Sequence, residues 1–176
     1  MKPIAVIVMG PSGIGKTTVA ELLSERLAWP FAEGDRFHSQ ANVDRMTRGF
    51  ALGDAERAPW LARIRDWISE QAEDGHCVVV ASSALKRGYR DILRGAQADV
   101  RFLQLVAEEN VVARRIAQRS GHYMPGSLLS SQFAALESLQ PDEAGVRIPA
   151  DRPPESVAME AVTLLDLHPA ENQVDD

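Results

Sequence analysis

The chain has 176 residues, of which 45% are hydrophobic and 25% charged, which is typical of one folded domain with a sizeable core. Its formal net charge of −6 argues against nucleic acid as the main partner. No apolar run approaches the ~20 residues that cross a bilayer, and no small-residue cleavage site follows the apolar start, so we expect no membrane span and no signal peptide. The single cysteine, Cys77, excludes an internal disulfide and favours a cytoplasmic location.

Segments typical of strands and helices alternate along the chain. Ile4–Met9 is a continuous apolar run, as in a strand buried on both faces of a parallel sheet. Lys16–Leu27 carries apolar residues at helical spacing. The same reasoning predicts further strands at 30–32, 77–81, 101–106 and 146–149, and helices at 40–48, 54–73, 86–94, 108–119, 127–139 and 155–167.

This alternation predicts an α/β fold, a three-layer sandwich around a five-stranded parallel sheet. One domain is expected over residues 1–167, followed by a flexible acidic tail at 168–176. Pro59 is expected in or near the first turn of its helix, where proline is tolerated.

A glycine-rich loop joins the first strand to the first helix. Residues 10–17 read Gly-Pro-Ser-Gly-Ile-Gly-Lys-Thr and fit the pattern G-x-x-x-x-G-K-[ST] of a phosphate-binding P-loop. Glycines let backbone N–H groups face phosphate oxygens, and the helix N-terminus attracts the same anion. Lys16 is predicted to bridge the outer phosphates and the Thr17 hydroxyl to ligate Mg²⁺. The predicted nucleotide contacts are Gly10, Pro11, Ser12, Gly13, Ile14, Gly15, Lys16, Thr17 and Thr18.

The P-loop alone does not define the reaction, because switches, motors and kinases all use it. The sequence contains no Asn-Lys-x-Asp motif that would read guanine. The third predicted strand ends in Ser82-Ser83 rather than in a Mg²⁺-orienting aspartate. The acidic pair that follows the second strand, Glu33 and Asp35, is the available alternative.

Four blocks of the chain resemble the bacterial gluconokinases, ATP-dependent kinases of D-gluconate with a nucleoside-monophosphate-kinase-like fold. The first block is the P-loop. The others are 34–61, which begins Gly34-Asp35-Arg36-Phe37-His38; 83–94, which begins Ser83-Ala84-Leu85-Lys86-Arg87; and 119–137, which begins Arg119-Ser120-Gly121-His122. They lie in family order and span about residues 4–150. The resemblance implies ATP as co-substrate, Mg²⁺ as cofactor, and a possible homodimer.

The chain departs from the family pattern at several positions. Ser39 stands where the family usually has proline, Ala51 where it has proline, and Ser82 where it has cysteine. These differences leave open a relaxed or altered preference among small sugar acids.

The resemblance places an acceptor site around Asp35. This carboxylate is predicted to hold the substrate hydroxyl, with deprotonation as a secondary role; the alternative is an N-cap of the following segment. Glu33 is a weaker candidate for orienting Mg²⁺-bound water, against a solvated loop carboxylate. Further candidate contacts to the acid and its hydroxyls, each with a structural or surface role as the alternative, are His38, Arg45, Arg57, Ser83, Lys86, Arg90, His122 and Gln132.

Arg115 and Arg119 precede a breaker-rich loop. In this fold a segment such as 115–127 acts as a lid that brings arginines to the transferring phosphate. Lys16, Asp35 and Arg119 are therefore the predicted catalytic residues, with Arg115 on the nucleotide. An exposed basic helix end is the alternative for both arginines.

The leading hypothesis is ATP-dependent phosphorylation of D-gluconate to 6-phospho-D-gluconate. A kinase of another small sugar acid on the same fold is the nearest alternative. A nucleotide-binding switch without a phosphorylated product is the alternative from a different class.

Overall fold

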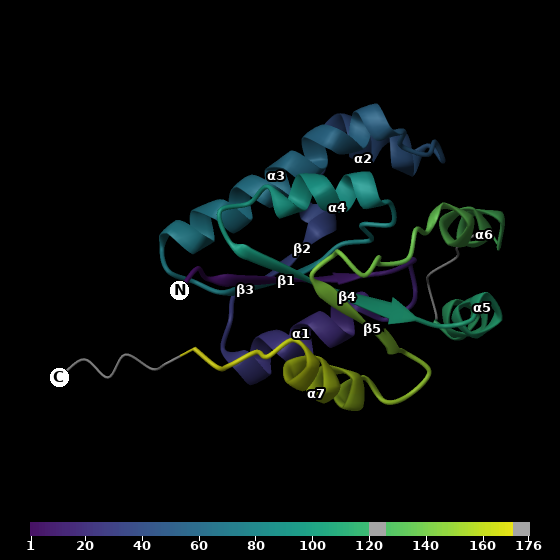
Figure 1. Cartoon of the computed structure of the whole chain (residues 1–176). Helices are drawn as coiled ribbons and strands as arrows, with labels where there is room; N and C mark the ends of the chain where they lie inside the picture. The colour runs from purple at the N-terminus through teal and green to yellow at the C-terminus, as the bar shows by residue number, and fades with distance from the viewer. Residues whose placement is uncertain (120–125, 171–176) are drawn as a thin grey trace.

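The computed structural model describes residues 1–119 and 126–170 (Figure 1). Five strands form one sheet in the order β2-β3-β1-β4-β5, with every neighbouring pair parallel. The strands are β1 (Ile4–Met9), β2 (Phe31–Glu33), β3 (Val78–Ala81), β4 (Asp99–Val106) and β5 (Gly145–Pro149). The helices are α1 (Lys16–Leu27), the 3-10 helix η1 (Gly34–Phe37), α2 (Gln40–Thr47), α3 (Asp54–Glu73), α4 (Arg87–Arg94), α5 (Glu109–Gln118), α6 (Gly126–Ala135) and α7 (Pro154–Leu164).

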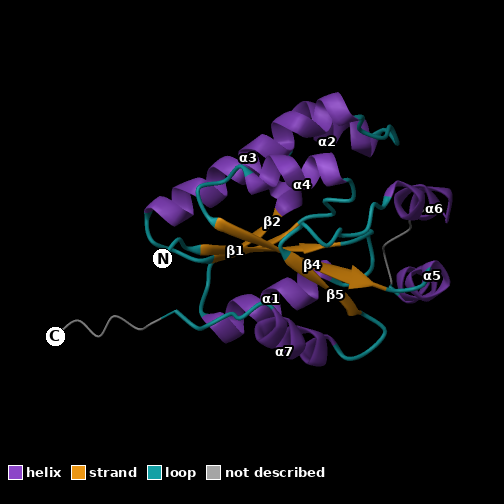
Figure 2. Ribbon diagram, viewed as in Figure 1, coloured by secondary structure: helices purple, strands orange, loops and turns teal. Residues whose placement is uncertain are grey.

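Helices cover both faces of the sheet, which makes the three layers visible in Figure 2. Alternate residues of β1 enter different cores because successive strand side chains point to opposite faces. Val6 and Val8 pack with α1 and α7, whereas Ala5, Ile7 and Met9 pack with α3 and α4. The predicted α/β sandwich with five parallel strands is confirmed.

The strand order reverses at β1, which lies between β3 and β4. In parallel α/β sheets, ligands bind beyond the carboxyl ends of the strands at such a reversal. The glycine-rich loop leaves the carboxyl end of β1, and α5 and α6 lie at the same end of the sheet (Figure 1). The topology therefore places the predicted site at this edge.

Pro59 is the sixth residue of α3, near the first turn of its helix as expected. Some predicted boundaries are wrong in detail. The helix predicted at 127–139 ends at Ala135, and the segment 136–144 that follows it crosses to β5. At the chain end, the backbone N–H of Ala170 donates to the carbonyl of Leu27 at 2.9 Å, so the expected tail is tied to α1 up to this residue. Residues 171–176 of that tail lie outside the described residues.

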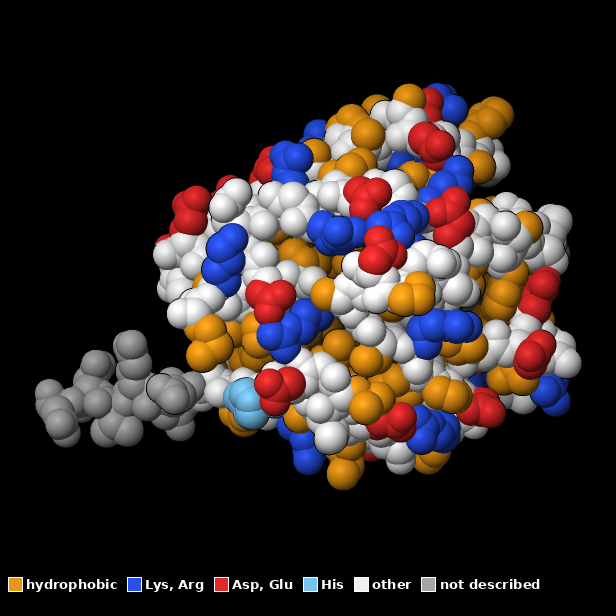
Figure 3. Space-filling view, in the orientation of Figure 1, with side chains coloured by type: hydrophobic (Ala, Val, Ile, Leu, Met, Phe, Trp, Pro, Cys, Tyr) orange, Lys and Arg blue, Asp and Glu red, His pale blue; other side chains and the backbone are white. Residues whose placement is uncertain are grey.

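Among residues 1–119 and 126–170, every helix is too short or too polar to span a bilayer. The charges on the face in Figure 3 are of both signs and intermixed, including over α4. Arg87 and Arg94 of α4 form ion pairs with Asp142 and Asp91.

Gly34 sets how closely the end of β2 approaches β3. A Cβ at this position would lie 2.6 Å from the carbonyl oxygen of Ala81 and 3.2 Å from the Cβ of Ser82. We therefore expect Gly34→Ala to lower the free energy of unfolding by about 1–3 kcal/mol, as for other overpacked sites. Urea denaturation followed by circular dichroism would measure the change.

Gly88 is the matched control, because a Cβ added to this glycine of α4 meets no atom within 4 Å. Alanine is the better helix former by about 1 kcal/mol, so Gly88→Ala should leave the protein equally or more stable. Equal destabilisation by the two substitutions would contradict the close approach at Gly34.

Candidate active site

Residues 10–15 form a loop in which three glycines have a backbone that other residues rarely adopt. Gly10, Gly13 and Gly15 have φ values of 148°, 80° and 107°. A Cβ on Gly13 would also lie 2.5 Å from Cγ1 of Ile116. The loop therefore depends on glycine for its path, and the path ends at the N-terminus of α1, where backbone N–H groups lack helical partners.

Lys16 is the partly buried cation of this loop. Its Nζ donates to the carbonyl of Pro11 at 3.0 Å. Burial lowers the pKa of Lys16 from 10.5 to about 8, opposed by the negative charges of Asp35 and Glu33. An anion at the helix N-terminus would favour the protonated form, so the site is prepared for phosphate.

Glu33 and Asp35 lie across the cavity from the loop. The Thr17 hydroxyl donates to Oε2 of Glu33 at 2.7 Å, and burial raises the pKa of Glu33. A cavity of about 400 Å³ holds these groups together, lined by Ser12, Gly13, Gly15, Lys16, Thr17, Thr18, Glu33, Asp35 and Arg119. The structure thus brings the three predicted catalytic residues to one space.

A second cavity of about 240 Å³ lies between the P-loop, the end of α5 and the start of α7. Arg115 and Arg119 line it, and Arg115 bonds the carbonyls of Ile14 and Ala150. Arg152 and Pro154 complete its wall. Arg152 was not among the predicted residues, although it lies in the segment that follows β5, at the ligand-binding edge of the sheet.

His38 stacks on Trp60, with ring centroids 4.3 Å apart and planes 16° from parallel. Trp60 is buried and donates through Nε1 to the carbonyl of Gly34 at 2.8 Å. The buried Nδ1 of His38 has no hydrogen-bond partner among the described residues, and burial lowers the pKa of this imidazole. His38 is thus a neutral, fixed ring beside the Asp35 turn.

Lys86 and Arg57 flank the ring of Tyr89, at 5.6 and 5.7 Å from its centroid. Lys86 Nζ and the Tyr89 hydroxyl both donate to Oδ1 of Asp54, at 3.1 and 2.5 Å. These hydrogen bonds hold the pKa of Asp54 below its usual value. Asp54 and Tyr89 were missed as partners of Lys86, although both lie in the blocks that carry the resemblance.

Arg45 is 3.7 Å from Glu56 in a partly exposed ion pair. Ser83 contributes its carbonyl, which accepts the N–H of Gly10 at 3.2 Å. Gln132 of α6 binds the P-loop at Ser12. Its Oε1 accepts the N–H of Ser12 at 2.7 Å, and its Nε2 donates to the Ser12 hydroxyl at 3.1 Å.

The prediction that Arg90 binds the substrate is wrong. Its side chain has no exposed surface and pairs with the buried Glu143. All three guanidinium nitrogens are used within the protein, so this arginine has no free edge for an acid. His122 and the centre of the predicted lid lie outside the described residues.

The sequence and the fold of the chain were compared with those of known proteins. Residues 6–139 match the family described as the AAA domain. The fold also matches an APS kinase from Mycobacterium tuberculosis at 21% identity, with a TM-score of 0.68 and 94% and 98% of the two chains covered. The protein thus has the fold of the P-loop kinases.

The relatives narrow this class. The chain is 46% identical over 162 residues to a gluconokinase of Gluconobacter oxydans, covering 92% of this chain and 91% of the relative. A gluconokinase structure from Sinorhizobium meliloti matches at 39% identity with a TM-score of 0.83, over 93% and 92% of the chains. A sugar kinase structure from Janibacter sp. matches at 44% identity with a TM-score of 0.90, over 95% and 96%. The chain belongs to the gluconokinase family.

The lowered pKa of Lys16 predicts how nucleotide binding depends on pH. A polyphosphate binds the protonated ammonium, and the unliganded protein loses that proton above pH ~8. The Kd for ATP, measured by calorimetry, should therefore rise above this pH, approaching about tenfold per pH unit. In Lys16→Arg the guanidinium stays protonated, so its Kd should change little over the same range; a flat profile for the unsubstituted protein would contradict the prediction.

Proposed function

We propose that the protein transfers the terminal phosphoryl group of ATP to the 6-hydroxyl of D-gluconate, giving 6-phospho-D-gluconate. The observation that carries the proposal is the single cavity that joins the P-loop cation Lys16 to the acceptor-side carboxylate Asp35. The names of its relatives support gluconate as the acceptor, since proteins called gluconokinases match most of the chain.

ATP would bind with its phosphates on residues 10–18 and its nucleoside toward the second cavity. That cavity adjoins the P-loop at Gly13 and Gly15 and is lined by Arg115 and Arg152. A planar guanidinium can stack on a base or bond a phosphate. Arg119 lines both cavities and would face the phosphates that connect them.

The Thr17 hydroxyl and the Glu33 carboxylate fit a magnesium site. Both are oxygen donors, they are held 2.7 Å apart, and Mg²⁺ in kinase sites is bound by one or two such groups, substrate phosphates and water. Thr17 would contact the ion, and Glu33 would act through a water molecule. When bound, the ion would neutralise charge on the outer phosphates.

Asp35 would accept a hydrogen bond from the attacking hydroxyl and orient it toward the terminal phosphate. Phosphoryl transfer depends mainly on positioning and charge stabilisation, so this carboxylate need not be a strong base. Lys16 and Arg119 would stabilise the charge on the transferred group. His38, fixed by Trp60 and neutral, would bond a hydroxyl of the polyol through Nε2, because its Nδ1 is buried.

The carboxylate of the acid would bind the cationic group formed by Lys86, Arg57 and Arg45. Lys86 and Arg45 are held in partly exposed ion pairs, which contribute little free energy and can exchange for a substrate carboxylate. This group would distinguish a sugar acid from a neutral sugar. The same chemistry would allow other sugar acids to bind.

Coupled measurement of ADP release tests the substrate assignment. Gluconate should accelerate release strongly over the ATP-only rate, whereas glucose, shikimate and nucleoside monophosphates should not. Mass spectrometry and NMR of the product would identify 6-phosphogluconate. Release with a different sugar acid alone would make the protein a kinase of that acid, and hydrolysis independent of any acceptor would favour a nucleotide switch.

Asp35→Asn tests the acceptor-side role. The amide keeps the shape of the carboxylate but removes the charge that orients the hydroxyl, so kcat should fall by about 10²–10⁴. The Kd for ATP should change by less than about threefold, because the nucleotide is held by the P-loop. A variant with near-normal kcat and weakened ATP binding would place Asp35 on the donor side instead.

A further inference from the structure

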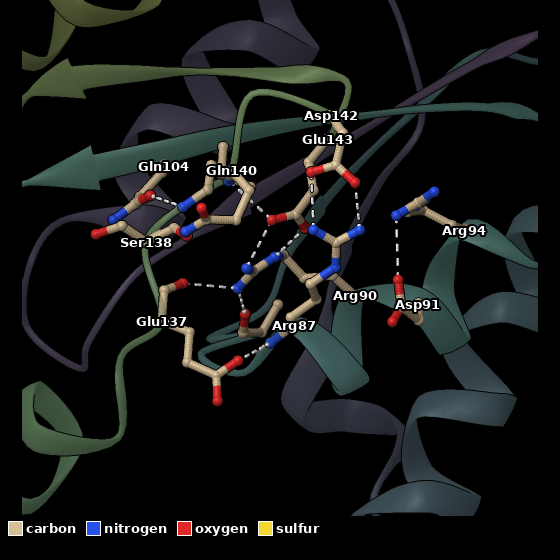
Figure 4. A network of polar contacts seen from close by, with 12 residues as sticks. Arg87, Arg90, Asp91, Arg94, Gln104, Glu137, Ser138, Gln140, Asp142 and Glu143 are labelled. Atoms are coloured by element: carbon tan, nitrogen blue, oxygen red, sulfur yellow. Dashed lines mark hydrogen bonds and ion pairs between the residues drawn. The ribbon is translucent and has the colours of Figure 1, made fainter.

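Arg90 of α4 and Glu143, which lies between α6 and β5, form a buried ion pair (Figure 4). Nε and Nη2 of Arg90 donate to the two carboxylate oxygens at 2.6 and 2.9 Å. These hydrogen bonds keep the pKa of Glu143 below its usual value, and its Oε2 also accepts the N–H of Gln140 at 3.0 Å. Stability alone does not explain such a pair, because well-packed apolar side chains often serve equally well.

The remaining nitrogen of Arg90 faces the backbone that leads from β3 to α4. Its Nη1 donates to the carbonyls of Ala84, Leu85 and Glu137, at 3.1, 3.3 and 3.0 Å. Because the guanidinium is planar, the two bonds to Glu143 also fix the direction of Nη1. Glu143 thus fixes, through Arg90, the position of the nitrogen that binds these carbonyls.

Ala84 has a backbone conformation that requires such support. Its φ is 42°, in the left-handed region that alanine rarely adopts, and its side chain is fully buried. A residue keeps this conformation only where its surroundings hold it. The Arg90 guanidinium bonds the carbonyl of this very residue.

The segment Ser83–Lys86 connects the two halves of the site. At one end, the Ser83 carbonyl accepts the N–H of Gly10, the first residue of the P-loop, at 3.2 Å. At the other end, Lys86 precedes α4 and reaches Asp54. A change in the backbone conformation of Ala84 would therefore move Lys86 relative to the phosphate-binding loop.

Glu137 gives this segment a second connection to the P-loop. Its N–H donates to the carbonyl of Leu85 at 2.8 Å, and its carboxylate accepts the N–H of Arg87 at 2.7 Å. Glu137 follows α6, whose Gln132 bonds both the N–H and the hydroxyl of Ser12. Arg90 donates to the carbonyls of both Leu85 and Glu137, so it binds both of the chain segments that meet here.

We propose that Arg90 and Glu143 are positioning residues, which fix the left-handed turn at Ala84 and thereby hold Lys86 at the acceptor side in register with the P-loop. The inference rests on the proposed function only in taking a sugar acid as the acceptor. Neither residue touches substrate.

Steady-state kinetics of Glu143→Gln and Arg90→Lys test the role. Glu143→Gln removes the charge that directs the guanidinium, and Arg90→Lys keeps a positive charge but loses the planar fork. Each should raise the KM for gluconate by about tenfold or more, because small misplacements of binding groups are costly. The KM for ATP should change by less than about threefold.

Asp142→Asn is the matched control. Asp142 precedes Glu143 in sequence and binds the neighbouring Arg87 through two oxygens, yet its side chain is mostly exposed. This variant removes a charge next to Glu143 in sequence but leaves the bonds of Arg90 in place. Its KM values should therefore stay within about twofold of those of the unsubstituted protein. Thermal melting would establish at which temperature all variants are folded.

Hydrogen exchange of the peptide covering 82–90 gives a readout that needs no acceptor. Exchange should be faster in Glu143→Gln and Arg90→Lys and unchanged in Asp142→Asn. Unchanged exchange in the first two variants, or equal rises in both KM values that merely follow the loss of thermal stability, would overturn the positioning role. Failure of the unsubstituted protein to phosphorylate gluconate would overturn the proposed function, while the exchange comparison would still decide the role of Arg90 and Glu143.

Discussion

The side chain of Lys16 is partly buried at the start of α1, and the loss of water around its ammonium group lowers its pKa to about 8. Asp35 and Glu33 oppose this effect only in part, so the group remains prepared for a stronger anion. Two close backbone approaches build the cavity in which this ammonium group can meet an anion. Gly13 lets the loop pass close to Ile116, and Gly34 lets the end of β2 approach β3, which brings the two carboxylates into the cavity of the lysine.

Burial separates the cations of this protein by role. Lys16 is partly buried and lines a cavity, which suits it to a phosphate. Arg90 is buried and fully bonded, so its charge serves the protein itself. Lys86 and Arg45 are partly exposed in weak ion pairs, and such groups can change partners when a substrate carboxylate arrives.

The sequence predicted the fold well because the signals for it are local. Apolar runs and helical spacing each lie within one segment, and the five strands were found at nearly their observed positions. Boundaries were less accurate where a side chain distant in sequence decides them. The helix α6 ends before 136 because Glu137 bonds Leu85 and Arg87 rather than continuing the helix. The departure at Ser39 also has a local explanation, since its hydroxyl accepts the N–H of Asn42 and caps α2.

The sequence by itself determined the phosphate-binding loop, the parallel sheet that presents it, and the identity of the carboxylates opposite it, because each is written in contiguous residues. It could not tell which arginines are buried in ion pairs within the protein and which stay exposed. Arg90 and Glu143 are 53 residues apart, as Lys86 and Asp54 are 32 apart, and only the folded chain decides which of these charges lose their water. That desolvation, rather than residue type, is what makes Arg90 a structural residue, whereas the side chain of Arg45 stays half exposed in its ion pair.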